Sequence, residues 1–137
     1  MGKFVTKSDI FASGKEAFKP QTVYVAGWGG DVKFKPMSMS ERREIRKKAS
    51  VPGLDELGNP TQIVDQESLE LWAIINCTLD PSDEANNRLM FGPQDFDALE
   101  KSVVAGSLSV LSLAILKASG MGPDSSFRKK EEGTEKG

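Results

Sequence analysis

The fold is decided by residues 22–41, TVYVAGWGGDVKFKPMSMSE, in which two alternating segments flank a glycine-rich turn. Val23 and Val25 occupy alternate positions before the turn. Val32 and Phe34 occupy alternate positions after it. Period-two alternation of β-branched and aromatic residues is typical of a half-buried antiparallel pair. The glycines of the turn adopt positive φ without steric cost. We therefore predict a β-hairpin here.

A helix is predicted to follow this hairpin directly. Pro36 ends the second strand because it has no N–H to give to a ladder. Ser38 and Glu41 then form a capping box, with Ser38 as the N-cap and Glu41 as the third helical residue. The helix runs to about Ala49 and ends before the Val-Pro-Gly sequence at 51–53. Its sequence is so polar that we expect it on the surface.

The same helix carries a basic run that has two interpretations. It could bind nucleic acid, or it could be a solvated face partly balanced by Glu41 and Glu44. The net charge of −2 favours the solvated face, because nucleic-acid-binding domains usually carry a large basic excess. The basic residues are Arg42, Arg43, Arg46, Lys47 and Lys48.

The composition excludes several kinds of site. The chain has 137 residues, 38% of them hydrophobic and 28% charged, which is typical of one globular domain. It contains no histidine, so Ser-His and Cys-His nucleophiles and His-ligated metals are excluded within it. Cys77 is alone, which rules out an internal disulfide and favours a reducing, cytosolic setting.

Residues 1–20 form a predicted N-terminal arm. Ser8 is a candidate cap for a short helix that ends at Gly14. We expect the arm to dock on the domain or on a neighbouring copy, because its apolar side chains need a surface: Ile10, Phe11 and Phe18. Further along, residues 51–62 are interrupted by Pro-Gly and Gly-Asn-Pro, and we predict a mobile linker there.

Three helices are predicted after the linker. The first follows the N-cap Asp65 and runs to about Thr78, with apolar residues on so much of its circumference that it belongs in the core. A short helix with Phe96 and Leu99 comes next, and a break near Ser102 separates it from the most apolar helix. One face of this last helix is a predicted core stripe of Val104, Leu108, Leu111 and Ile115. A second face would let another helix approach closely through small residues, Ser102, Gly106 and Ser109.

The predicted fold class is α+β, an N-terminal β-hairpin followed by a mostly α-helical bundle of about four helices. We divide the chain into the arm at 1–20, an α+β domain at 21–120 and a disordered, charged tail at 121–137. The only candidate membrane span, residues 103–116, is shorter than the roughly 20 apolar residues that a spanning helix needs.

No catalytic constellation is found. The glycines of the hairpin turn do not have phosphate-loop spacing, and a strand follows them where such a loop requires a helix. The carboxylates fall in loops or on the charged helix, and Cys77 lies in an apolar helix. We therefore expect a protein that is not an enzyme, uses no cofactor and acts by binding.

Residues 25–42 follow the pattern Val-x-x-Trp-Gly-Gly-x-Val-x-Phe-Lys-Pro-Met-Ser-x-x-Glu-Arg. This pattern resembles the opening of tail assembly chaperones of long-tailed, siphovirus-type phages. In element order the resemblance extends over roughly residues 8–120, and its specific part is 25–42. The sequence departs from the family at residues 1–7 and 51–62, for which nothing is implied.

The resemblance implies a non-enzymatic function in phage assembly. Members of the family coat the tape measure protein in the host cytoplasm, keep it soluble and help to recruit tail tube subunits. They form oligomers and are usually absent from the finished virion. A longer product made by ribosomal frameshifting often carries the tail-tube contact, and the Lys-rich segment 128–131 is a candidate site for such a slip.

Trp28 is an apolar ring at a turn where polar residues are usual, and two explanations remain open. It contacts a second molecule, since aromatic residues are enriched in contact hot spots, or it folds back over its own hairpin. The candidate surface for a partner or for self-association comprises Val25, Trp28, Val32, Phe34, Trp72, Leu108, Leu111 and Ile115. The competing functions are a small phage structural or connector protein and, with less support, a nucleic-acid-binding regulator.

Overall fold

The computed structural model describes residues 4–83 and 87–121. In chain order the elements are α1 (Lys7–Ala17), β1 (Gln21–Val25), the 3₁₀ turn η1 (Ala26–Trp28), β2 (Gly30–Phe34), α2 (Met39–Lys48), β3 (Ser50–Leu54), β4 (Pro60–Val64), α3 (Gln66–Cys77), the 3₁₀ turn η2 (Pro93–Asp95), α4 (Phe96–Ser102) and α5 (Ala105–Ala118).

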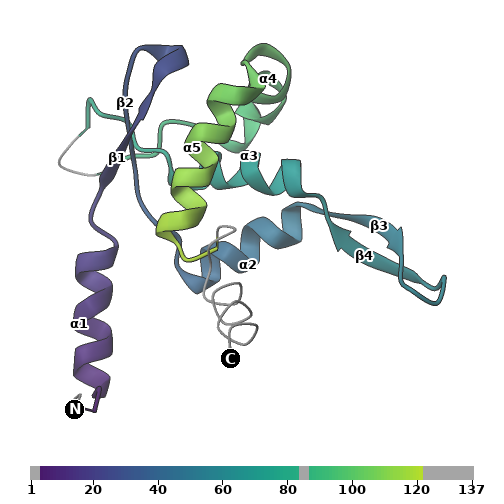
Figure 1. The fold of residues 1–137 in the computed structure, drawn as a ribbon, viewed down its shortest axis with the longest axis horizontal. Coiled ribbons are helices and arrows are strands. Elements are labelled where there is room, and N and C mark those ends of the chain that lie inside the picture. Colours follow the sequence, from purple (N-terminus) through teal and green to yellow (C-terminus); the bar gives the residue numbers. More distant parts are fainter. Residues whose placement is uncertain (1–3, 84–86, 122–137) are drawn as a thin grey trace, which may run out of the picture.

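The described part of the chain is a mixed α/β structure with five α-helices and two small antiparallel sheets. The predicted hairpin is present, but α1 precedes it and a second hairpin follows, so the prediction of one hairpin and about four helices is only partly correct. Figure 1 shows α1 and the β3–β4 hairpin projecting from a body that contains the first hairpin and the other helices.

The first hairpin has the predicted strands and turn. β1 pairs antiparallel with β2 in the register Val23 opposite Val32 and Val25 opposite Gly30. Gly29 adopts a φ of +69° after the 3₁₀ turn, a conformation that favours glycine. Gly27 approaches α5 so closely that a Cβ built on it would lie 2.2 Å from Ser107 Oγ. The glycines therefore serve two purposes: Gly29 lets the chain reverse, and Gly27 lets the turn pack closely against α5.

The capping box at the start of α2 is confirmed. The Ser38 hydroxyl accepts a hydrogen bond from the Glu41 N–H at 3.3 Å, and the Ser38 N–H donates to the Glu41 carboxylate at 2.9 Å. Ile45 is the buried residue of this otherwise polar helix, and Ala49 at its C-cap is buried too. The helix lies on the surface, as predicted, and anchors through this narrow stripe.

The core lies between the first hairpin and helices α2, α3 and α5. α3 contributes most of it, because apolar side chains surround much of the helix: Leu69, Leu71, Ala73, Ile74, Ile75 and Cys77 are buried. α5 packs across α3 through Leu111, Ile115 and Leu116. The prediction of a core helix after Asp65 is confirmed, and the predicted core face of the last helix is confirmed at Leu111 and Ile115. The prediction is wrong for Val104, which is the N-cap of α5 with an extended backbone and is 75% exposed, and Leu108 is only partly buried.

The prediction of a mobile linker at 51–62 is wrong. This region forms most of a second hairpin, with Val51 opposite Ile63 and Pro52 opposite Gln62. Its turn is closed by Asp55, whose carboxylate accepts hydrogen bonds from the N–H groups of Leu57 and Asn59 at 2.9 and 2.8 Å. Both strands are edges in a two-stranded sheet, so a proline can face solvent without breaking the ladder.

The N-terminal helix is longer than predicted. Its N-cap is Thr6, which forms a capping box with Asp9, so Ser8 is inside the helix. Gly14 is also inside, and the helix continues to Ala17. None of its residues is buried, and the side chains of Ile10, Phe11 and Phe18 are exposed. The expected docking on the domain is therefore not present, and docking on a neighbouring copy stays a prediction.

The break near Ser102 is confirmed, because α4 ends there and α5 begins at Ala105. Gly106 has no atom near the position of a Cβ, so the small-residue face is not packed by another helix of the described chain. Met121 closes the described part with its N–H donating to the Leu116 carbonyl at 2.7 Å. The predicted tail at 121–137 lies outside the described residues from position 122 onward.

Candidate functional site

An apolar pocket of about 320 Å³ lies beside the first hairpin. The first hairpin contributes Trp28 at its turn and three residues of β2, and the remaining lining comes from α3, the segment that follows it, α4 with its C-cap, and α5. The complete lining is Trp28, Asp31, Val32, Lys33, Ile74, Thr78, Pro81, Met90, Phe91, Leu99, Val103 and Leu111. Its volume falls in the range of roughly 300–1,000 Å³ that is typical of binding pockets.

Trp28 reaches this pocket because the turn is fixed on both sides. The N–H of Gly29 donates to the carbonyls of Val25 and Ala26 at 3.0 and 3.1 Å, which holds the 3₁₀ turn. Behind the turn, Val25 is fully buried. The side chain of Trp28 nevertheless remains 42% exposed, so the ring both lines the pocket and is accessible to another molecule.

The opposite wall is held by a short extended segment at 88–91. The N–H of Met90 donates to the Thr78 carbonyl at 2.9 Å, and Leu89 forms a bridge with Leu79. An ion pair of 2.9 Å between Arg88 and Asp80 fastens the start of this segment. These contacts place Met90 and Phe91 beside the end of α3.

Asp80 is strongly stabilised as a carboxylate. The hydroxyl and N–H of Ser82 donate to it at 2.7 and 2.9 Å, and Arg88 adds a charge-assisted hydrogen bond. Together they lower the pKa of Asp80 to about 2. The ion pair that fastens the wall is therefore present throughout the neutral and mildly acidic range.

Thr78 is an unusual member of the lining. It is fully buried, and its side-chain oxygen has no hydrogen-bond partner in the described residues. Its backbone is satisfied, since its N–H donates to the Ile74 carbonyl and its carbonyl accepts from Met90. A buried hydroxyl without a partner costs free energy, so Thr78 is a weak point in the packing beside the pocket.

The structure divides the predicted contact residues into separate groups. Trp28, Val32 and Leu111 line the apolar pocket, although Leu111 is almost completely buried. Three more of the predicted contact residues are buried in the core of the chain: Val25, Phe34 and Ile115. The eight residues therefore do not form one continuous surface.

The two remaining predicted contact residues lie elsewhere. Leu108 lines a second pocket between α3, α4 and α5. Trp72 packs against Phe96 with a centroid distance of 4.9 Å, and Lys48 Nζ lies 4.6 Å from the centre of the Trp72 ring. Trp72 thus packs α3 against α4 and α2, so contacts within one chain explain a large aromatic residue at this position.

Several residues of the pocket were not among the predicted contact residues: Thr78, Met90, Phe91, Leu99 and Val103. A signal for part of this wall is present in the sequence, because Leu89-Met90-Phe91 is an apolar run between polar loops. No pattern, however, indicates that this run meets the hairpin, since the two are far apart along the chain.

The described residues contain no candidate metal cluster, and their single thiol is unreactive. Nowhere in this part of the chain do three or more His, Cys, Asp or Glu side chains gather in a way that could hold a metal ion. Burial raises the pKa of the Cys77 thiol to about 12, which removes it as a nucleophile near neutral pH. Within residues 4–83 and 87–121, no helix has both the length and the apolar character needed to cross a bilayer.

Comparisons of the chain with protein-family models, with curated protein sequences and with solved structures return no match. The sequence pattern at residues 25–42 and the geometry of the pocket beside Trp28 are therefore the observations on which a functional proposal rests.

Proposed function

We propose that this chain is a tail assembly chaperone of a long-tailed phage, which binds apolar segments of the tape measure protein in the pocket beside Trp28. One observation carries the proposal. Trp28 and Val32 belong to the pattern that resembles these chaperones, and both line an apolar pocket that is open to solvent. The pattern and the pocket thus converge on the same side chains.

The chemistry of the pocket suits an amphipathic helix as its ligand. Such helices bind grooves by inserting apolar anchors spaced three or four residues apart. The walls of the pocket include the large aromatic ring of Trp28 and the side chains of Met90 and Phe91. Methionine adapts its shape easily, so one pocket can accept different apolar anchors along a long helical partner.

In this proposal the chain acts in the host cytoplasm, in several copies, and leaves before the virion is complete. Its contact with tail tube subunits is assigned to a longer product of the same gene. The gene sequence tests that last point, because a frameshift requires a slippery heptamer and an overlapping downstream frame near codons 128–131.

Co-expression with the neighbouring long, helical tape-measure-like protein tests the function. We expect the partner to become soluble and to co-purify with the wild-type chain. Trp28→Ala should reduce the recovered partner strongly, because it removes the accessible aromatic wall of the pocket. Tyr24→Ala is the matched control, since Tyr24 is an exposed aromatic residue on the same hairpin that does not line the pocket.

Equal recovery of the partner with Trp28→Ala and Tyr24→Ala would move the binding surface away from this pocket. Failure of the wild-type chain to keep the partner soluble would overturn the chaperone function itself. Mass spectrometry of purified virions separates the connector alternative, because a connector remains in the particle. A salt-dependent DNA shift that is lost on charge reversal along α2 would favour the nucleic-acid-binding alternative.

A further inference from the structure

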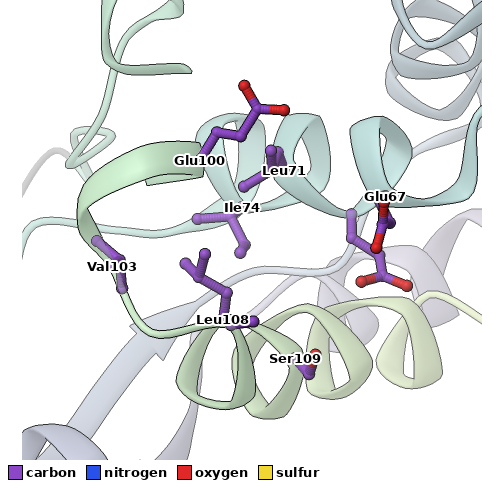
Figure 2. Close-up of a pocket in the computed structure, with 9 residues that line it drawn as sticks. Glu67, Leu71, Ile74, Glu100, Val103, Leu108 and Ser109 are labelled. Atoms are coloured by element: carbon purple, nitrogen blue, oxygen red, sulfur yellow. The ribbon is translucent and has the colours of Figure 1, made fainter. Parts of the chain in front are cut away.

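A second pocket, of about 260 Å³, combines an apolar floor with an acidic rim. Figure 2 shows Ile74 and Leu108 pointing toward one another from α3 and α5, with Leu71 beside them. The rim carries three carboxylates, Glu67, Glu70 and Glu100. None of these carboxylates forms an ion pair with another described residue.

The outer face of α2 has the complementary character. Met39 is 65% exposed, and it lines a shallow hollow together with Arg42, Arg43 and Arg46. The neighbouring carboxylate of Glu41 does not neutralise these arginines, because it pairs with Lys35. No ion pair within the described residues involves any of the three arginines, and the Arg42 Nε–H is buried without an acceptor.

We propose that two copies of this chain associate head to tail, with the Met39 face of α2 in one copy docked on the acidic-rimmed pocket of the next. Met39 would meet the apolar floor, and the arginines that follow it along α2 would meet the glutamate rim. Opposite charges beside an apolar contact give an interface both orientation and selectivity.

Charge and apolar character together favour a second copy of this chain, rather than a nucleic acid, as the partner of the Met39 face. A nucleic acid would satisfy the arginines, but it would leave the exposed methionine at the N-terminal end of their row without an apolar partner. The acidic pocket satisfies both, and it repels nucleic acid itself. Because the two surfaces differ, a docked pair keeps one free surface of each kind, the pocket of one copy and the α2 face of the other, so the contact produces rings or open chains.

The two pockets share Ile74 and Val103, but the charged residues of this contact do not line the pocket beside Trp28, so failure of the contact and failure of the chaperone function are distinguishable. Sedimentation velocity of the full chain over a range of concentrations and salt is the measurement. We expect the wild-type chain to self-associate, and more weakly at high salt, because the attraction between the two surfaces is screened.

Two charge-reversal variants test the two surfaces. Arg43→Glu/Arg46→Glu removes the basic face, and Glu70→Arg/Glu100→Arg removes the acidic rim while leaving Glu67 to support the first turn of α3. Each variant alone should raise the dissociation constant of self-association by at least about tenfold. Lys15→Glu/Lys47→Glu is the control for the arginine variant, because it makes the same net change of charge at residues that line neither pocket, and it should associate like the wild type.

The mixture of the two variants is the decisive sample. The intact acidic pocket of the first variant accepts the intact basic face of the second, and the reversed charges of the two variants are also opposite in sign, so the mixture should recover the association that each variant alone has lost. The proposal is overturned by a wild-type chain that stays monomeric, by variants that associate like the wild type, or by a mixture that stays monomeric. Loss of DNA binding in the arginine variant with unchanged self-association would overturn it in favour of nucleic acid.

Discussion

The unpartnered hydroxyl of Thr78 gives the sharpest prediction of stability. Thr78→Val replaces the hydroxyl by a methyl group of nearly the same size and keeps the branched Cβ. Valine also suits the backbone at this position, which is extended with φ of −80° and ψ of 128°. The substitution therefore removes a buried polar atom and changes little else.

The magnitude follows from the burial of Thr78. Leaving a buried hydroxyl without a partner costs about 1–3 kcal/mol, and Thr78 is fully buried with no partner in the described residues. We expect Thr78→Val to raise the free energy of unfolding by that amount. With an m-value of about 1.5 kcal/mol/M in urea, the unfolding midpoint should rise by roughly 0.7–2 M.

Ser112→Ala is the matched comparison. Ser112 is equally buried, but its hydroxyl donates to the Ser109 carbonyl at 3.3 Å. Removing a hydrogen bond that is made should lower the free energy of unfolding by about 0.5–1.5 kcal/mol, so the two variants shift the urea midpoint in opposite directions. A midpoint that falls in Thr78→Val as it does in Ser112→Ala would refute the reasoning, because it would mean that the Thr78 hydroxyl is satisfied.

Three further predictions concern the capping box and the cysteine. Ser38→Ala should lower the free energy of unfolding by about 1 kcal/mol in urea titrations, because it removes the side-chain acceptor of the Glu41 N–H, and an unchanged midpoint would contradict this. Burial alone would raise the pKa of Glu41, but hydrogen bonds from Lys35 and from the Ser38 N–H outweigh it and hold the pKa below 4.5. This lowered pKa contributes stability that is present above pH 4.5 and is lost as the pH falls through the folded value, so Glu41→Gln should flatten the acid side of the stability profile; an equally steep acid side would argue against it. Cys77 should resist thiol reagents at pH 8 in the native protein and react once in high urea, and fast labelling of the native protein would show that α3 opens locally.

Local signals were sufficient to predict the elements whose cause is itself local. The Ser38 box, the alternation of the first hairpin and the apolar circumference of α3 each involve residues a few positions apart. The structure contains all three, because tertiary packing agrees with the local preference at these places.

The second hairpin was not predicted because its proline and glycine residues are also typical of a loop. Pro52 and Pro60 normally argue against a strand, yet in a sheet of only two strands each proline can lie on the outer edge. The exposed surroundings of β4 also remove the alternation of buried and exposed positions that would have marked it. The extension of α1 past Gly14 has a similar cause, since one glycine costs a helix only about 1 kcal/mol.

The pocket beside Trp28 shows where prediction from a motif must end. The apolar ring at the turn lines a pocket whose other wall is formed by Met90, Phe91 and Val103. Those residues lie outside the 25–42 pattern. They are brought to the hairpin by backbone hydrogen bonds of residues 78–79 to β2 and to Met90, together with the packing of α3 and α5. The pattern therefore specifies one wall and the position of an aromatic anchor. Under the proposed function, selectivity for a particular partner comes from the other wall, so two proteins that share the pattern would be free to bind different apolar segments.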